Sequence, residues 1–204
     1  IIVGSVVPFL SGVIGDALEL IFDCTILTVG SGIKSGLDIK IDNPAQLGAD
    51  FVANSVAASV RHSLPAVIVD YGTATTVSFI NSEKVFSGTV IMPGMRMGVD
   101  ALADRAALLS FVKLEKPQSL IGKNSQSSVL SGVLFGTAIQ TDGFIDKIMN
   151  EFNAPHATLL ATGGLAKYVL PLCSHKITHE PYLTLIGLLQ LYKINTAKTQ
   201  RKPR

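Results

Sequence analysis

Residues 66–76 read Ala-Val-Ile-Val-Asp-Tyr-Gly-Thr-Ala-Thr-Thr, and this stretch decides the fold. An apolar, β-branched run stops at the carboxylate of Asp70, and Gly72 and several threonines follow at once. The pattern predicts a buried strand that delivers Asp70 to a tight turn, from which a second strand leaves. Backbone N–H groups freed by such a turn suit a phosphate, and the neighbouring carboxylate suits a cation. Because phosphate and cation act together in phosphoryl transfer, the stretch indicates a nucleotide-dependent phosphotransferase.

The composition is that of a folded protein with an extensive core. Of the 204 residues, 48% are hydrophobic and only 16% are charged, which excludes disorder for most of the chain. The mean hydropathy of +0.43 is high, yet no apolar run reaches membrane-spanning length without interruption. We therefore expect no membrane partner, and we assign the excess of apolar residues to the core and to a buried contact between subunits.

Charge and cysteine content argue against nucleic acid and zinc as partners. The net charge is only +2, and much of it comes from the basic residues of 196–204, which we expect to form a disordered tail. A nucleic-acid-binding tail is the other interpretation of this stretch. The two cysteines, Cys24 and Cys173, are far apart in sequence and have no metal-ligand spacing. They predict a reducing, cytoplasmic environment.

Hydrophobic periodicity predicts an α/β chain with a mixed sheet flanked by helices. Two strands end in glycine turns, at Gly72 and at Gly163-Gly164, and nucleotides bind at such strand ends. We expect helices over about 8–22, 44–61, 94–109, 127–152 and 183–194, with a further one after Gly164, and strands over 25–29, 66–70, 74–80, 84–91, 157–161 and near 176–179.

Two carboxylates are candidates for chemistry. Asp50 lies in a helix opened by Asn43-Pro44, and it is either a first-turn carboxylate favoured by the helix dipole or a general base for a substrate hydroxyl. Asp70 ends a buried strand, so it needs a cation or hydrogen-bond donors, and functional and structural interpretations are evenly balanced. Gly163-Gly164 is either a plain helix start or a nucleotide contact.

Several longer motifs occur in a specific order. In chain order they are Asp42-Asn43-Pro44, Gly48-Ala49-Asp50, Asp70-Tyr71-Gly72-Thr73, Met92-Pro93-Gly94, Gly122-Lys123-Asn124 and Ala161-Thr162-Gly163-Gly164. With these motifs the chain resembles the type III pantothenate kinase family over nearly its whole length.

The resemblance implies an actin-like, ribonuclease-H-like ATPase fold of two related halves, and a homodimer. Residues 1–62 would be the remainder of the N-terminal half and carry the substrate helix, and residues 63–195 would form the C-terminal half. The implied activity is the ATP-dependent phosphorylation of pantothenate, the first step of coenzyme A biosynthesis. It would use ATP with Mg²⁺ and a monovalent cation, K⁺ or NH₄⁺.

Residue roles also follow from the resemblance. Asp50 would be the general base that takes the proton of the pantothenate primary hydroxyl. Asp70 would hold the monovalent cation, and Thr73 would contact an ATP phosphate. The pantothenate site would be lined by Gly48, Ala49, Asp50, Phe51 and Ser125.

Several residues depart from the family pattern, including Phe51 and Ile41. Phe51 stands where the family usually has an arginine, which removes a charge-assisted anchor, and Ile41 stands where it usually has a tyrosine. The resemblance also implies an Asp-x-Gly-Asn-Thr phosphate loop ahead of Ile1, so we expect an N-terminally truncated chain with an incomplete first half. A catalytically impaired homologue with a binding or regulatory role is therefore the alternative function. Another actin-like phosphotransferase, such as a sugar or acetate kinase, is a third.

Overall fold

The computed structural model describes residues 1–105 and 112–197, and the chain divides into two compact units. The first unit contains residues 1–64, 80–88 and those from Tyr182 onward, and the second contains residues 65–79 and 89–181. The domain division that the sequence suggests, at residue 62, stays a prediction. Most of the expected tail, 196–204, and the end of the helix expected over 94–109 lie outside the described residues.

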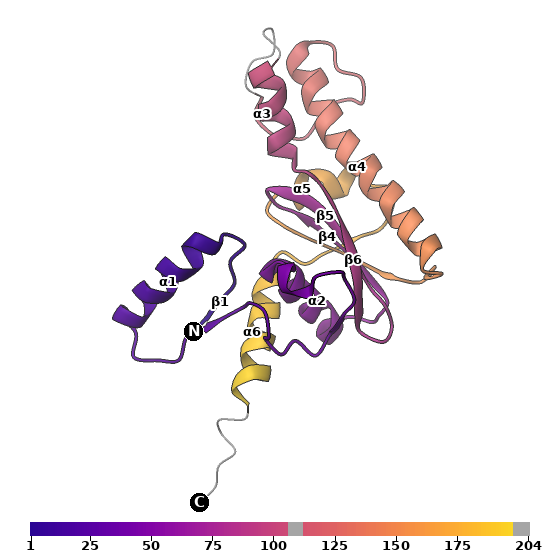
Figure 1. The fold of residues 1–204 in the computed structure, drawn as a ribbon. Helices are drawn as coiled ribbons and strands as arrows, with labels where there is room; N and C mark the ends of the chain where they lie inside the picture. The colour runs from indigo at the N-terminus through magenta and orange to yellow at the C-terminus, as the bar shows by residue number, and fades with distance from the viewer. Residues whose placement is uncertain (106–111, 198–204) are drawn as a thin grey trace, which may run out of the picture. The chain divides into compact units, whose positions relative to one another are not determined.

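The first unit is helical with short strands (Figure 1). Two of its strands, β1 and β2, form a separate parallel pair. Its elements are β1 (Ile2–Val3), α1 (Pro8–Ile21), β2 (Leu27–Thr28), β3 (Asp38–Ile39), the 3₁₀ turn η1 (Pro44–Gln46), α2 (Ala49–Arg61) and α6 (Leu183–Thr196).

The second unit holds most of the main sheet and the long helix α4 (Figure 1). Its elements are β4 (Ala66–Tyr71), β5 (Ala74–Ile80), β6 (Val85–Pro93), α3 (Met95–Arg105), α4 (Ser125–Glu151), β7 (Thr158–Thr162), α5 (Ala166–Val169), the 3₁₀ turn η2 (Leu170–Leu172) and β8 (Thr178–His179). The last residue of β5 and the first half of β6 belong to the first unit.

The main sheet has six strands in the order β3-β6-β5-β4-β7-β8. β3 pairs with β6, β4 with β7 and β7 with β8 in parallel fashion. In the β4–β7 register Asp70 lies opposite Thr162, so the carboxyl ends of these two strands are neighbours. The sheet is mixed and flanked by helices, which confirms the predicted fold class.

The core of the second unit lies between the sheet and α4. Side chains at alternate positions of a strand point to one face, and the odd-numbered residues of β4 and β5 are buried on the same side. Residues of α3 and α4 pack against them. The fully or nearly fully buried members include Val67, Val69, Tyr71, Val77, Phe79, Met95, Val99, Leu134, Ala138 and Ile145.

In the first unit, helices α2 and α6 pack against each other at unusually short range. A Cβ atom placed on Gly187 would collide with the carbonyl oxygen of Ala53, so only glycine permits this approach. Beside this contact the Thr184 hydroxyl donates a 2.7 Å hydrogen bond to Oδ1 of Asn54. The packing of α2 therefore depends on a residue near the other end of the sequence.

The structure corrects three details of the sequence prediction. The helix expected over 44–61 is interrupted at Leu47 and Gly48, where η1 ends and α2 begins. Met92-Pro93, which lies beyond the strand expected over 84–91, completes β6. The short strands β1 and β3 were not predicted. Among the described residues, no helix combines the length and apolarity needed to cross a membrane.

We predict that Gly187→Ala lowers the free energy of unfolding by about 1–3 kcal/mol, because the added methyl group forces α6 away from α2. The matched control is Gly143→Ala in α4, where a Cβ atom meets nothing within 4 Å. That variant should be neutral or up to about 1 kcal/mol more stable, since alanine favours a helix. Chemical denaturation measures both. Equal effects of the two substitutions would contradict the close packing of α2 and α6.

Candidate functional site

Asp70 lies at the end of β4, where the sequence predicts a turn. Its side chain is half-buried, whereas Thr73 is exposed at the tip of the turn. The turn is closed by a hydrogen bond in which the Gly72 N–H donates to the Ala74 carbonyl oxygen at 3.1 Å. The predicted strand–turn–strand is therefore confirmed, and the structure brings Asp70 and Thr73 to the same strand end.

Two further glycines pack closely against this strand end. Gly163, which follows β7, has φ +94°, and a Cβ atom on it would lie 2.5 Å from the Tyr71 carbonyl oxygen and 2.6 Å from Oδ1 of Asp70. Gly94, which follows β6, packs against the carbonyl group of Thr73 so closely that a Cβ atom there would collide with it. Three chain segments thus meet at this strand end, and the backbone of Gly163 lies beside the Asp70 carboxylate.

Tyr71 anchors this strand end in the core. Its hydroxyl shares a 3.0 Å hydrogen bond with the Thr141 hydroxyl of α4, and both residues are fully buried. Burial raises the pKa of Tyr71 well above its usual value, so the phenol stays neutral. Nearby, burial and the charge of Asp142 raise the pKa of Cys173 to about 11. The thiol is therefore a protonated packing group rather than a nucleophile.

The donor set at this strand end fits a hard cation and a phosphate. A carboxylate oxygen with neighbouring backbone carbonyl oxygens provides the all-oxygen environment that such cations prefer. The exposed Thr73 hydroxyl is available to a phosphate oxygen. Gly163-Gly164 lies just before α5, which begins at Ala166, as the helix-start interpretation predicts. Because α5 contains only four residues, it adds no helix dipole for a nucleotide.

In the first unit, Asp50 lies in the first turn of α2. Gly48 is the N-cap, and Oδ1 of Asp50 accepts a 2.9 Å hydrogen bond from the Phe51 N–H. A Cβ atom on Gly48 would lie 2.5 Å from that same oxygen. The backbone therefore fixes one carboxylate oxygen, and the position of the carboxylate requires glycine at 48.

The ring of Phe51 contacts a second aromatic ring at this turn. Its ring lies 6.4 Å from the ring of Phe86 in β6, at an interplanar angle of 58°. Phe51 is half-buried, whereas Phe86 is fully buried. Sequence analysis missed Phe86, because an apolar residue in a strand gives no indication of which turn it contacts.

A cavity of about 300 Å³ borders the segment that leads to Asp50. It is lined by residues 29–33, Ser35, Ile39, Pro44, Ala45, Leu47 and Val52. The Asn43 side chain accepts a 3.2 Å hydrogen bond from the Ala45 N–H and so caps η1 at the cavity edge, as its place before Pro44 predicts.

Ser125 belongs to the second unit, where it is the first residue of α4 and is exposed. Asn124 caps this helix through a 2.9 Å hydrogen bond from the Ser127 N–H. Ser125 also borders an open hollow between α3 and α4, together with Gly98, Leu102, Ser128, Val129, Gly132 and Val133. Of the expected site residues, Gly48 to Phe51 lie in the first unit, and Asp70, Thr73 and Ser125 lie in the second.

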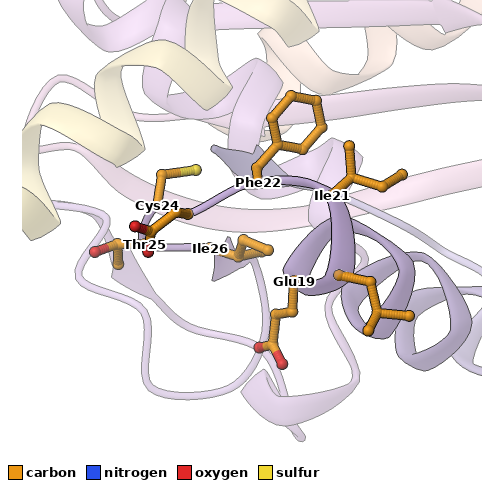
Figure 2. A pocket seen from close by; sticks show the side chains of 8 residues that line it. Glu19, Ile21, Phe22, Cys24, Thr25 and Ile26 are labelled. Atoms are coloured by element: carbon orange, nitrogen blue, oxygen red, sulfur yellow. The ribbon is translucent and has the colours of Figure 1, made fainter.

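A larger surface hollow, of about 820 Å³, carries none of the expected site residues. It is lined only by the consecutive residues 19–26 at the end of α1. Figure 2 shows the side chains of Glu19, Phe22 and Cys24 pointing in different directions rather than toward one another. Because no polar groups converge there, this hollow is not the candidate site.

Comparison with known proteins shows close relatives. The family model of type III pantothenate kinase matches residues 1–147. A type III pantothenate kinase from Bacillus cytotoxicus is 42% identical over 202 residues, which cover 99% of this chain and 77% of the relative. Another, from Exiguobacterium sibiricum, is 39% identical over 195 residues, covering 96% of this chain and 76% of the relative.

Solved structures show the same fold at lower identity. A conserved protein of the Baf family of transcriptional activators from Campylobacter jejuni has a TM-score of 0.56 and 18% identity, covering 90% of this chain and 89% of the other. The activator of 2-hydroxyisocaproyl-CoA dehydratase from Clostridium difficile, with bound ADPNP, has a TM-score of 0.50 and 8% identity, covering 95% and 85%. These neighbours have the actin-like ATPase fold. With the family match over most of its length, this chain belongs to the type III pantothenate kinase family.

Proposed function

We propose that this protein transfers the γ-phosphoryl group of ATP to the primary hydroxyl of pantothenate, the first step of coenzyme A biosynthesis. The observation that carries the proposal is the family match over residues 1–147, which includes both Asp50 and the Asp70 turn. The identity of 42% with a relative named type III pantothenate kinase supports it. No observation favours the catalytically impaired alternative.

Asp50 is the proposed general base. As the pantothenate hydroxyl oxygen forms its bond to the γ-phosphorus and the bond to the β-phosphate oxygen breaks, the hydroxyl proton passes to the Asp50 carboxylate and ADP leaves. The hydrogen bond from the Phe51 N–H holds Oδ1 in place. Such positioning matters because phosphoryl transfer depends mainly on geometry and charge. Gly48, Ala49, Phe51 and Ser125 are the proposed pantothenate contacts.

Asp70 is the proposed ligand of a monovalent cation, K⁺ or NH₄⁺, and Thr73 the proposed contact to an ATP phosphate. The support is the oxygen-rich strand end described above. Mg²⁺ bound with the nucleotide would neutralise charge that develops on the phosphates. We place the reaction in the cytoplasm, where ATP is available and where the free thiols Cys24 and Cys173 are compatible with reducing conditions.

We also propose that the protein acts as a homodimer through the exposed face of α3 and α4. Leu102 and Met97 are 41% and 49% exposed there, and the neighbouring hollow is open. Gly132 and Gly136 meet nothing within 4 Å, so their lack of a side chain serves no contact within the described part of this chain. A second copy of the chain is the occupant that these small residues would admit.

Asp50→Asn should lower kcat for pantothenate phosphorylation by about 10²- to 10⁴-fold, because the amide cannot accept the proton. The amide oxygen can still accept the hydrogen bond from the Phe51 N–H, so thermal stability should change little. The matched control is Glu151→Gln at the exposed end of α4, which should keep full activity. A coupled assay for ADP release with ATP, Mg²⁺ and K⁺ measures both. Full activity of Asp50→Asn would exclude this base.

Gly163→Ala should reduce activity by about 10²-fold, because the methyl group displaces the Asp70 carboxylate and the end of β4. The adjacent variant Gly164→Ala is the control, since a Cβ atom on Gly164 meets nothing within 4 Å. K⁺ titrations of both variants report on the cation site. If the two variants have the same K⁺ dependence and activity, the strand end is not the cation site.

The dimer predicts twice the mass of the 21.6 kDa chain in sedimentation equilibrium. Gly132→Arg, which places a long charged side chain in the hollow between α3 and α4, should shift the protein to the monomer. Glu151→Arg, at the exposed far end of the same helix and about 100° around its axis from Gly132, should leave the dimer intact. A monomeric wild-type protein would contradict the proposal.

A further inference from the structure

Phe86 connects the two segments of the first unit that lead into the acceptor site. Its ring meets the ring of Phe51, next to Asp50. Its carbonyl oxygen accepts a 3.0 Å hydrogen bond from the Lys40 N–H, directly before Ile41. The strand pairing places Phe86 opposite Ile39. One buried residue thus fixes both the start of the segment at Ile41 and the turn at Phe51.

The Phe51 ring also lies beside the carboxylate of Asp50. From the position of a Cβ atom on Gly48, Oδ1 of Asp50 is 2.5 Å away and Cδ2 of Phe51 is 3.3 Å away. The carboxylate and the edge of the ring therefore lie on the same side of Gly48. A group that reaches Asp50 from this side meets an apolar wall.

Pantothenate has a matching pattern of groups. Its reacting primary hydroxyl is on a CH₂ group, and the next carbon carries two methyl groups. If the hydroxyl lies at the Asp50 carboxylate, the two methyl groups are the apolar part closest to the base. An aromatic edge next to the base can cover them and remove their surface from water.

We propose that Phe86 is a positioning residue that holds Phe51 as an apolar wall beside Asp50, and that this wall recognises the two methyl groups of pantothenate. The inference rests on the proposed function. Phe86 is fully buried, so it acts through Phe51 rather than by touching the substrate. The ring of Phe51 then forms a specificity surface for the part of the acceptor that adjoins the hydroxyl.

The test compares kcat/KM for pantothenate with kcat/KM for its analogue that lacks both methyl groups. The wild type should prefer pantothenate by about fourfold for each methyl group covered. Phe51→Leu and Phe86→Leu should each reduce this preference by about three- to tenfold, because the aromatic pair is lost. The double variant should lose little more than either single variant, since both act through one contact.

The matched control is Phe79→Leu, which removes another aromatic pair. Phe79 lies in the core of the second unit, and its ring stacks at 4.3 Å on the more exposed ring of Phe152. This variant should lose stability to a similar degree but keep the wild-type preference for pantothenate. An unchanged preference in Phe86→Leu, or an equal loss in Phe79→Leu, would overturn the inference.

Hydrogen exchange of the Phe51 amide separates this inference from the proposed function, because it needs no turnover. Phe86→Leu should speed exchange at this amide, whose N–H is bonded to Asp50, and Phe79→Leu should not. Equal exchange in the two variants would overturn the positioning role even in an active enzyme. A wild type that phosphorylates neither acceptor would overturn the proposed function and methyl recognition, while faster exchange in Phe86→Leu would still establish the positioning role.

Discussion

The close approach of the Gly163 backbone to the end of β4 is the constraint on which the second unit depends. The parallel register of β4 and β7 sets Asp70 opposite Thr162, so the residue that follows must pass directly beside the Asp70 carboxylate. Only a residue without Cβ, and one that tolerates φ +94°, can do so. The Gly163 backbone thereby lies directly beside the carboxylate. The buried Tyr71–Thr141 hydrogen bond fixes the same strand end to α4.

In the first unit, a glycine likewise lies next to the carboxylate of Asp50. Gly48 leaves room for Asp50 to turn back onto the Phe51 N–H, at the positive end of the α2 dipole. Behind it, Gly187 allows α6 to press against α2. In both units a candidate carboxylate depends on a glycine close to it. The aromatic pair of Phe51 and Phe86 adds an apolar ring next to Asp50.

Much of the fold could be predicted from local pattern. The strands at β4, β5 and β7 and the long helix α4 follow periodicities that run for five residues or more, and the structure confirms them. The break at Gly48 and the four-residue α5 could not be predicted in this way. Their bounds follow from caps and close packing, which involve residues far apart in sequence. Phe86 was also missed, because it meets its partner Phe51 only when the chain has folded.

The sequence by itself determined the family, the strand–turn–strand at Asp70 and the candidate base, because ordered motifs and residue types are local properties of the chain. Tertiary structure alone decided which glycines are indispensable and what the unusual Phe51 contacts. Gly163, Gly187 and Gly143 are chemically identical, yet the first two face backbone and the third faces open space. The physical reason is that steric exclusion and aromatic contact depend on distances between segments, which arise only when the chain has folded.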